Sequence, residues 1–254
     1  MKNKININEN LVDKVNSKKL TRGNIDQFVM NFLSNFGTTL EVLKMFRNNT
    51  NEKYCKMALS QHIVTLVSLC ETLFRDIFVC ILEKEPNYID KIKNEYNLKI
   101  DNMQNETILK IKDILPEFFN FQNIYDIERV FKFIIEGDNF YENIGELVIP
   151  LYDSADNKIN KFSLNKSFKN WFSLFNNVIK ERHNIVHDSN YNTTFNSNNI
   201  ASYQRVVLFF SQILSLLITT KFSLPYIALH IKDGLEIPYI ITLEEYDHTW
   251  QIVE

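Results

Sequence analysis

The segment MALSQHIVTLVSLCETLFRDIFVCILEK, residues 57–84, decides the fold class that the sequence predicts. Its apolar side chains recur every three or four residues, the spacing of a helix face that packs against a core. The apolar positions are Leu59, Ile63, Leu66, Val67, Cys70, Leu73, Phe74, Ile77, Phe78 and Ile81. Pro86 follows the segment, and proline ends a helix because it lacks a backbone N–H. The sequence therefore predicts a long core helix here.

The same periodicity elsewhere in the chain predicts an all-α fold. Five glycines and five prolines in 254 residues favour long helices over a β fold with many turns. The last thirty or so residues alternate instead, and Asp233-Gly234 between apolar flanks predicts a small β-hairpin. We expect further helices at 24–47, 104–115, 124–136, 164–187 and 200–222, and a loop-like region at 137–160 with a short strand at 146–152. The predicted architecture is a helical bundle with a C-terminal β-hairpin appendage.

The sequence divides into three predicted parts. A polar lead-in and a helix occupy 1–50, the main helical domain occupies 51–222, and the hairpin extension occupies 223–254. Three cysteines, an odd number in helical surroundings, argue against a disulfide framework. The N-terminus lacks the apolar stretch of a secretory signal, and the apolar run at 206–220 is short for a membrane span and contains Ser and Gln. We therefore predict a cytoplasmic protein that does not enter a membrane.

The segment KERHNIVHD, from Lys180 to Asp188, interrupts an apolar helix stripe with polar side chains. Apolar residues at 175, 178 and 179 predict that positions 182, 183 and 186 also face the core. Position 186 is valine, but positions 182 and 183 are Arg and His. Burying a charge without a partner is costly, so a functional site is expected where the pattern breaks in this way.

These residue types suit the cleavage of RNA without a metal. The ribose 2′-OH attacks the adjacent phosphate when a group with a pKa near neutrality, such as His187, takes its proton. Arg182 would stabilise the charge that develops on the phosphate, and Asn184 would orient the imidazole or donate to a phosphate oxygen. Residues 182 and 187 lie about 140° apart around an ideal helix. They converge only if the helix ends near His187 or if two copies of the chain combine their sites.

The run Arg182-His183-Asn184-Ile185-Val186-His187 resembles the Arg-x4-6-His motif of the HEPN superfamily. The similarity covers roughly 55–222, and Glu71 resembles an acidic or polar helix position often seen in HEPN domains. Members of this family are compact helical domains that dimerise and place two such motifs in a shared cleft. Many are metal-independent endoribonucleases of antiviral defence, toxin–antitoxin pairs or CRISPR effectors. The resemblance implies a homodimer without a cofactor, RNA as the substrate, and an antitoxin or a defence-system protein as a partner.

Three sets of residues follow from this interpretation. The predicted catalytic residues are Arg182, His187 and Asn184. The supporting candidates are His183, Asp188 and Glu71. Because the net charge is −3, phosphate binding must come from a local patch of basic side chains. The candidates for this patch are Lys166, Lys169 and Lys180.

Structural interpretations of the same residues stay open at this point. Arg182 could be an arginine at the edge of the core that pairs with Glu71 or Asp188. His187 could be an ordinary histidine at the negative end of a helix dipole. Glu71 and Arg75, four residues apart, could form a surface pair on one helix.

His183 and His187 have a spacing that can bind a metal, but the zinc-protease motif has glutamate after its first histidine. Asn184 occupies that position here, so we expect no metal site. Two other functions remain: a non-catalytic HEPN-like module that binds RNA, a nucleotide or a protein, and a purely structural helical interaction protein.

Overall fold

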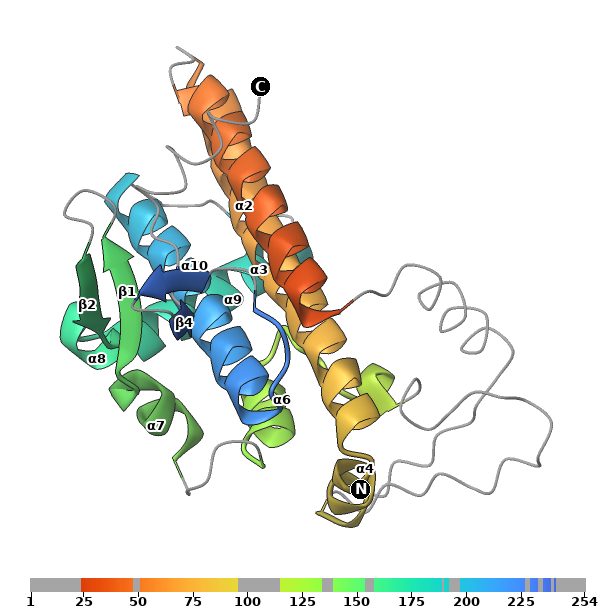
Figure 1. Ribbon diagram of the computed structural model, residues 1–254. Helices are drawn as coiled ribbons and strands as arrows, with labels where there is room; N and C mark the ends of the chain where they lie inside the picture. The colour runs from red at the N-terminus through yellow and green to blue at the C-terminus, as the bar shows by residue number, and fades with distance from the viewer. Residues whose placement is uncertain are drawn as a thin grey trace.

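The described part of the protein is a helical bundle with two small β-hairpins, which confirms the mostly helical class (Figure 1). The computed structural model describes residues 24–47, 51–95, 115–133, 139–153, 158–188, 190–191, 197–226, 229–232, 235–238 and 240. The helices are α2 (Ile25–Arg47), α3 (Glu52–Lys84), α4 (Asn87–Glu95), the 3-10 helix η1 (Leu115–Phe118), α6 (Ile124–Phe131), α7 (Phe140–Glu146), α8 (Leu164–Ser167), α9 (Trp171–His187) and α10 (Ser197–Lys221). The strands are β1 (Ile149–Asp153), β2 (Lys158–Phe162), β3 (Leu229–Lys232) and β4 (Leu235–Pro238).

Helices α2 and α3 form a long antiparallel hairpin whose tip is at the top of Figure 1. The Asn51 side chain accepts a hydrogen bond from the Lys53 N–H and so caps the start of α3. The Cys55 thiol donates to the carbonyl of Phe46 across the tip, at 3.2 Å. The predicted apolar face of α3 is buried from Ile63 onward, and α2 packs its own apolar face into the same core. The core helix predicted from residues 57–84 is therefore present, and it begins five residues earlier.

Helix α10 runs through the middle of the core, parallel to α3 and antiparallel to α9. The Cys70 thiol lies 3.3 Å from the Ser211 hydroxyl, which fixes the register between α3 and α10. The rings of Trp171 and Phe175, at the start of α9, pack on Phe210 with centroids 5.6 and 4.5 Å away. Among the described residues, only α10 is long and apolar enough to cross a membrane, and 78% of its most apolar stretch is buried in the molecule.

The prediction of one helix over 164–187 is wrong in one respect, because this segment forms two helices. Phe168 has an extended backbone between α8 and α9. This turn brings the Phe168 ring against Phe162 and Phe209, with centroids 6.4 and 5.7 Å away. The packing of Phe168 on these two rings explains why the continuous helical pattern does not give a continuous helix.

The region 137–160, expected to be loop-like with one short strand, contains more structure than that. Helix α7 precedes β1, and β1 pairs with β2 in an antiparallel hairpin with Ile149 opposite Phe162. Within α7, a Cβ on Gly145 would lie 2.4 Å from Asn165 Oδ1 and 2.7 Å from Trp171 Nε1. Glycine at this position therefore permits α7 to approach α8 and α9 closely.

Other differences concern the edges of the predicted elements. Helix α6 ends at Phe131 rather than at 136. Helix α4, which follows Pro86, was not expected. Most of the predicted helix at 104–115, with the polar lead-in at 1–22, lies outside the described residues.

The predicted C-terminal hairpin is confirmed. Strands β3 and β4 pair antiparallel, with Leu229 opposite Pro238. Ile240, which follows β4, is fully buried and forms an isolated parallel bridge with Leu151 of β1. The C-terminal segment therefore contacts the first hairpin through Ile240.

Candidate functional site

The Arg–His motif forms the last two turns of α9, at the same end of the bundle as the α2–α3 tip. His187 is the last helical residue, and the N–H of Asp188 closes the helix by donating to the Asn184 carbonyl at 3.0 Å. The Asp188 carboxylate accepts a hydrogen bond from the Asn190 N–H at 2.9 Å. The motif is therefore helical along its whole length, and Arg182 and His187 point about 140° apart within one chain.

Arg182 occupies a position at the edge of the core. Val178, one turn earlier, is fully buried, and Arg182 and Ile185 are half-buried. The prediction that positions 183 and 186 also face the core is wrong, because His183 is exposed and Val186 is 46% exposed. The buried face of α9 runs through 175, 178, 182 and 185, so only one polar residue of the motif, Arg182, interrupts it.

Arg182 has no ion pair and no hydrogen bond in the part of the chain that the structure describes, and its Nε is buried. The predicted alternative partners contact other groups. Glu71 accepts from Arg75 Nη2 at 2.7 Å and from the side-chain amide of Gln122. The interpretation of Arg182 as a paired structural arginine is therefore wrong for both proposed partners. A half-buried guanidinium without a carboxylate can offer its donors to an anion.

The two histidines of the motif lie next to each other on the surface. His183 and His187 are both exposed, and their ring centroids are 4.6 Å apart. This pair is accessible to a ligand that approaches the end of α9. The described ranges contain no group of three or more His, Cys, Asp and Glu side chains that could hold a metal ion.

Two residues beside the motif were missed by sequence reasoning. The Tyr191 hydroxyl donates to the Glu181 carboxylate, and this hydrogen bond raises the pKa of Tyr191. Asn184 also hydrogen-bonds the Tyr191 hydroxyl, so its amide contacts a tyrosine. Glu181 is visible in the sequence as a neighbour of the motif, but Tyr191 lies beyond the helix end, where helical periodicity gives no signal.

Burial raises the pKa of Tyr203 on α10, and the nearby Glu181 carboxylate adds to this effect. Tyr203 is 6% exposed and was expected only as part of an apolar helix. Its position beside Glu181 shows that the start of α10 lies against the end of α9.

The three candidate lysines do not form one patch. Lys166, Lys169 and Lys180 are all exposed, but the first two lie before the start of α9. Lys180 lies nine residues beyond Trp171, about 14 Å along the helix axis. Only Lys180 is therefore near the Arg–His motif of its own chain, and Lys169 borders a separate pocket.

Comparison with known proteins finds no matching family model, no matching curated protein and no matching solved structure. The fold and the site define a helical protein with two exposed histidines at one helix end and an arginine that has no partner among the described residues.

Proposed function

We propose that this protein is a metal-independent endoribonuclease of the HEPN type that acts as a homodimer, in antiviral defence or as a toxin. The observation that supports it is Arg182, a half-buried cation with no acidic partner among the described residues, on the same two helical turns as the exposed His183 and His187. A permanent cation and an imidazole are the two kinds of group that metal-free RNA cleavage requires.

The reaction assigns a task to each group. The imidazole of His187 takes the proton from the ribose 2′-OH, and the 2′ oxygen attacks the adjacent phosphorus. The P–O5′ bond breaks, and the 5′ oxygen takes a proton from an imidazolium, either that of His187 in the second copy or that of His183. Arg182 donates to the non-bridging oxygens, where charge builds up in the transition state. The products carry a 2′,3′-cyclic phosphate and a 5′-hydroxyl.

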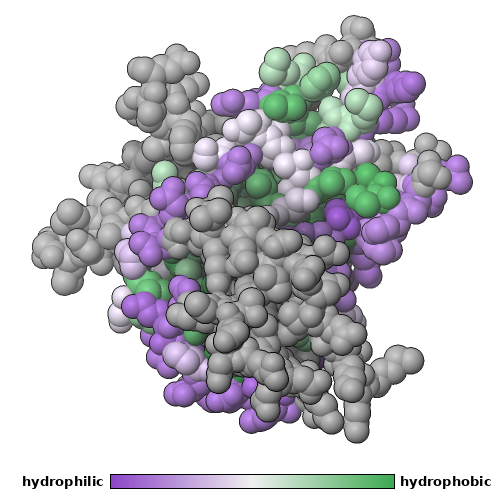
Figure 2. All heavy atoms as spheres, turned by 90° about the vertical axis from the view of Figure 1, so that its right-hand side faces the viewer, coloured by the Kyte–Doolittle hydropathy of each residue, from purple (hydrophilic) through white to green (hydrophobic). Residues whose placement is uncertain are grey.

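A second copy of the chain supplies the convergence that one α9 lacks. Large apolar side chains are exposed at the end of the bundle that carries the motif, and Figure 2 shows apolar atoms near the top of the molecule. Those at the α2–α3 tip are Val42, Met45, Phe46, Tyr54 and Met57, with exposures between 40% and 78%. Exposed apolar surface of this kind is typical of a protein interface. This tip is the face through which we propose that the two copies associate.

The first experiment is cleavage of mixed cellular RNA by the purified protein in EDTA. We expect wild type to cut and to leave 2′,3′-cyclic phosphate ends. His187→Ala should lose about 10²–10⁴-fold in rate, the usual contribution of a general acid or base. Asn177→Ala, an exposed position on the same helix, is the matched control and should cut like wild type. Equal cutting by His187→Ala would contradict the proposal.

Binding without cleavage selects the alternative function. If the wild-type protein and His187→Ala bind the same RNA equally and neither cuts it, the chain acts as a non-catalytic RNA-binding module. Arg182→Ala would then weaken binding instead of turnover, because its guanidinium would contact only ground-state phosphate.

Mixing two inactive variants tests the composite site. In a mixture of Arg182→Ala and His187→Ala chains, a mixed dimer keeps one intact Arg182 and one intact His187 on different copies. If the residues of one site come from different copies, the mixture regains part of the activity. If they come from one copy, the mixture stays as inactive as each variant alone.

A further inference from the structure

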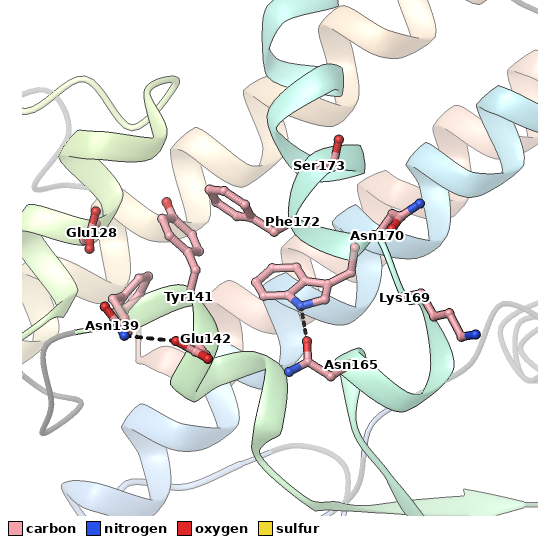
Figure 3. A pocket seen from close by; sticks show the side chains of 11 residues that line it. Glu128, Asn139, Tyr141, Glu142, Asn165, Lys169, Asn170, Phe172 and Ser173 are labelled. Atoms are coloured by element: carbon pink, nitrogen blue, oxygen red, sulfur yellow. Dashed lines mark hydrogen bonds between the residues drawn. The ribbon is translucent and has the colours of Figure 1, made fainter.

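A second concave site lies at the opposite end of α9, where this helix begins beside α6, α7 and α8 (Figure 3). Its volume is about 620 Å³, within the range of pockets that enclose small molecules. Arg182 lies eleven residues beyond Trp171, the first residue of α9, which is about 16 Å along the helix axis. The pocket is therefore separate from the Arg–His motif of the same chain.

Aromatic rings form the middle of the pocket wall. The rings of Tyr141 and Phe172 lie 4.5 Å apart between centroids, and Trp171 lies 5.9 Å from Phe172. Phe172 is 37% exposed, although it stands at the start of a core helix. A ring that is held by its neighbours and open on one side can stack on a planar base.

The Glu128 carboxylate lies at one end of the pocket. The Glu128 side chain is half-buried and makes no ion pair or hydrogen bond among the described residues. The nearby Tyr141 hydroxyl donates instead to the Ile124 carbonyl, at 2.5 Å. Burial and, to a lesser degree, the charge of Glu128 raise the pKa of Tyr141 well above its ordinary value. Glu128 therefore presents two acceptor oxygens that no donor contacts within the described ranges.

Hydrogen-bond donors lie at the other end of the pocket. Figure 3 places Lys169 and Glu128 on opposite sides of the aromatic rings. The backbone N–H groups of Phe172 and Ser173 have no acceptor among the described residues, and Asn170 does not cap them with its side chain. These donors and the Lys169 ammonium are suited to a phosphate at the edge of the pocket.

We propose that this pocket binds a guanine nucleotide, with the base stacked on Phe172, its Watson–Crick edge on Glu128 and its phosphate beside Lys169. At neutral pH a carboxylate can only accept hydrogen bonds, so it favours an edge with two adjacent donors. Guanine has such an edge in its N1–H and N2–H₂ groups, whereas adenine, cytosine and uracil each place an acceptor beside a donor. The pair of oxygens on Glu128 therefore distinguishes guanine from the other bases.

The test is direct binding of GMP and AMP to the full chain, measured by calorimetry. We expect GMP to bind at least about tenfold more tightly than AMP, because hydrogen bonds to a charged acceptor are among the stronger ones. Glu128→Gln should remove this preference, and Phe172→Ala should weaken both nucleotides. Glu146→Gln, a nearby exposed glutamate on α7, is the matched control and should bind like wild type. Lys169→Ala should weaken GMP but leave guanosine unchanged.

The guanine could belong to a free nucleotide or to an RNA strand. Short RNAs with a single guanine, compared with their adenine versions in the His187→Ala background, separate the two sources without cleavage. Tight binding of GMP identifies a free nucleotide, and binding of the guanine-containing RNA alone identifies a strand. Equal affinity for GMP and AMP, together with equal binding of the guanine and adenine RNAs, would overturn the proposal. Because binding is measured instead of cleavage, failure of this site leaves the proposed ribonuclease activity untouched.

Discussion

Lowering the pH from 6.5 to 4 should destabilise the fold through one buried side chain, His62 of α3. The ring is 2% exposed, with Nδ1 3.2 Å from Thr39 Oγ1 in α2 and Nε2 2.8 Å from Gln204 Nε2 in α10. The amide nitrogen of Gln204 can only donate, so His62 Nε2 accepts and the neutral ring carries its proton on Nδ1. Protonation would place a second donor against Gln204 in a buried site, which is costly.

The size of this effect follows from the pKa of the ring. Burial lowers the pKa of His62 to about 4, although a hydrogen bond to Thr39 acts in the opposite direction. In the unfolded chain the pKa is about 6.5. The unfolded state therefore binds the proton more tightly, so the stabilisation is complete above pH 6.5 and is lost as the pH falls towards 4. At about 1.4 kcal/mol for each pH unit, this interval corresponds to about 3 kcal/mol.

Urea denaturation followed by circular dichroism at several pH values between 7 and 4 measures this loss. Carboxylates also titrate in this range, so the informative quantity is the difference between wild type and His62→Gln. The variant should be less stable than wild type at pH 7 and should approach it at pH 4. The free energy of unfolding of His183→Gln, which changes an exposed histidine, should depend on pH in the same way as that of wild type. Parallel curves for wild type and His62→Gln would refute the role assigned to the buried ring.

Three other substitutions have definite expected outcomes. Gly145→Ala should cost about 1–3 kcal/mol in urea unfolding, because the new methyl overlaps Asn165 and Trp171; unchanged stability would show that α7 can move away. Phe210→Ala should cost about 3–5 kcal/mol, because its fully buried ring contacts four other aromatic rings. Arg182→Met should keep or raise the melting temperature, since no ion pair is lost, while RNA cleavage is abolished. A large drop in melting temperature would instead assign Arg182 a structural role.

The sequence predicts the long helices well because their periodicity reports burial directly. The apolar positions of α3 are spaced by three and four residues, and the same positions line the core. The end of α9 at His187 coincides with the change from apolar to polar residues in the sequence. The C-terminal hairpin follows from an Asp-Gly turn between apolar residues. In each case, a local pattern and the tertiary structure agree.

Periodicity fails where a tertiary contact overrides local preference. Phe168 continues the apolar pattern into α9, but its ring packs on Phe162 and Phe209 only if the helix breaks there. The exposure of His183 was missed for a related reason. Two adjacent faces of α9 fit the apolar pattern, one through positions 183 and 186 and the other through 182 and 185. The packing of α9 against α3 and α10 decides which face is buried. The pocket beside Phe172 combines side chains from α6, α7 and α9, so no single segment predicts it.

Helix α9 connects the two proposed sites and determines how they would depend on each other. The pocket surrounds its first turn, and the Arg–His motif forms its last two turns, about 16 Å further along. One mononucleotide cannot occupy both sites of one chain, but a strand of several nucleotides can reach from one to the other. If the pocket binds a base of the strand that is cut, cleavage should fall at a fixed distance from a guanine. Glu128→Gln should then remove that positional preference. If the pocket binds free GMP, the position of cleavage should not depend on guanine. GMP would then change the cleavage rate only by binding two states of the protein with different affinities.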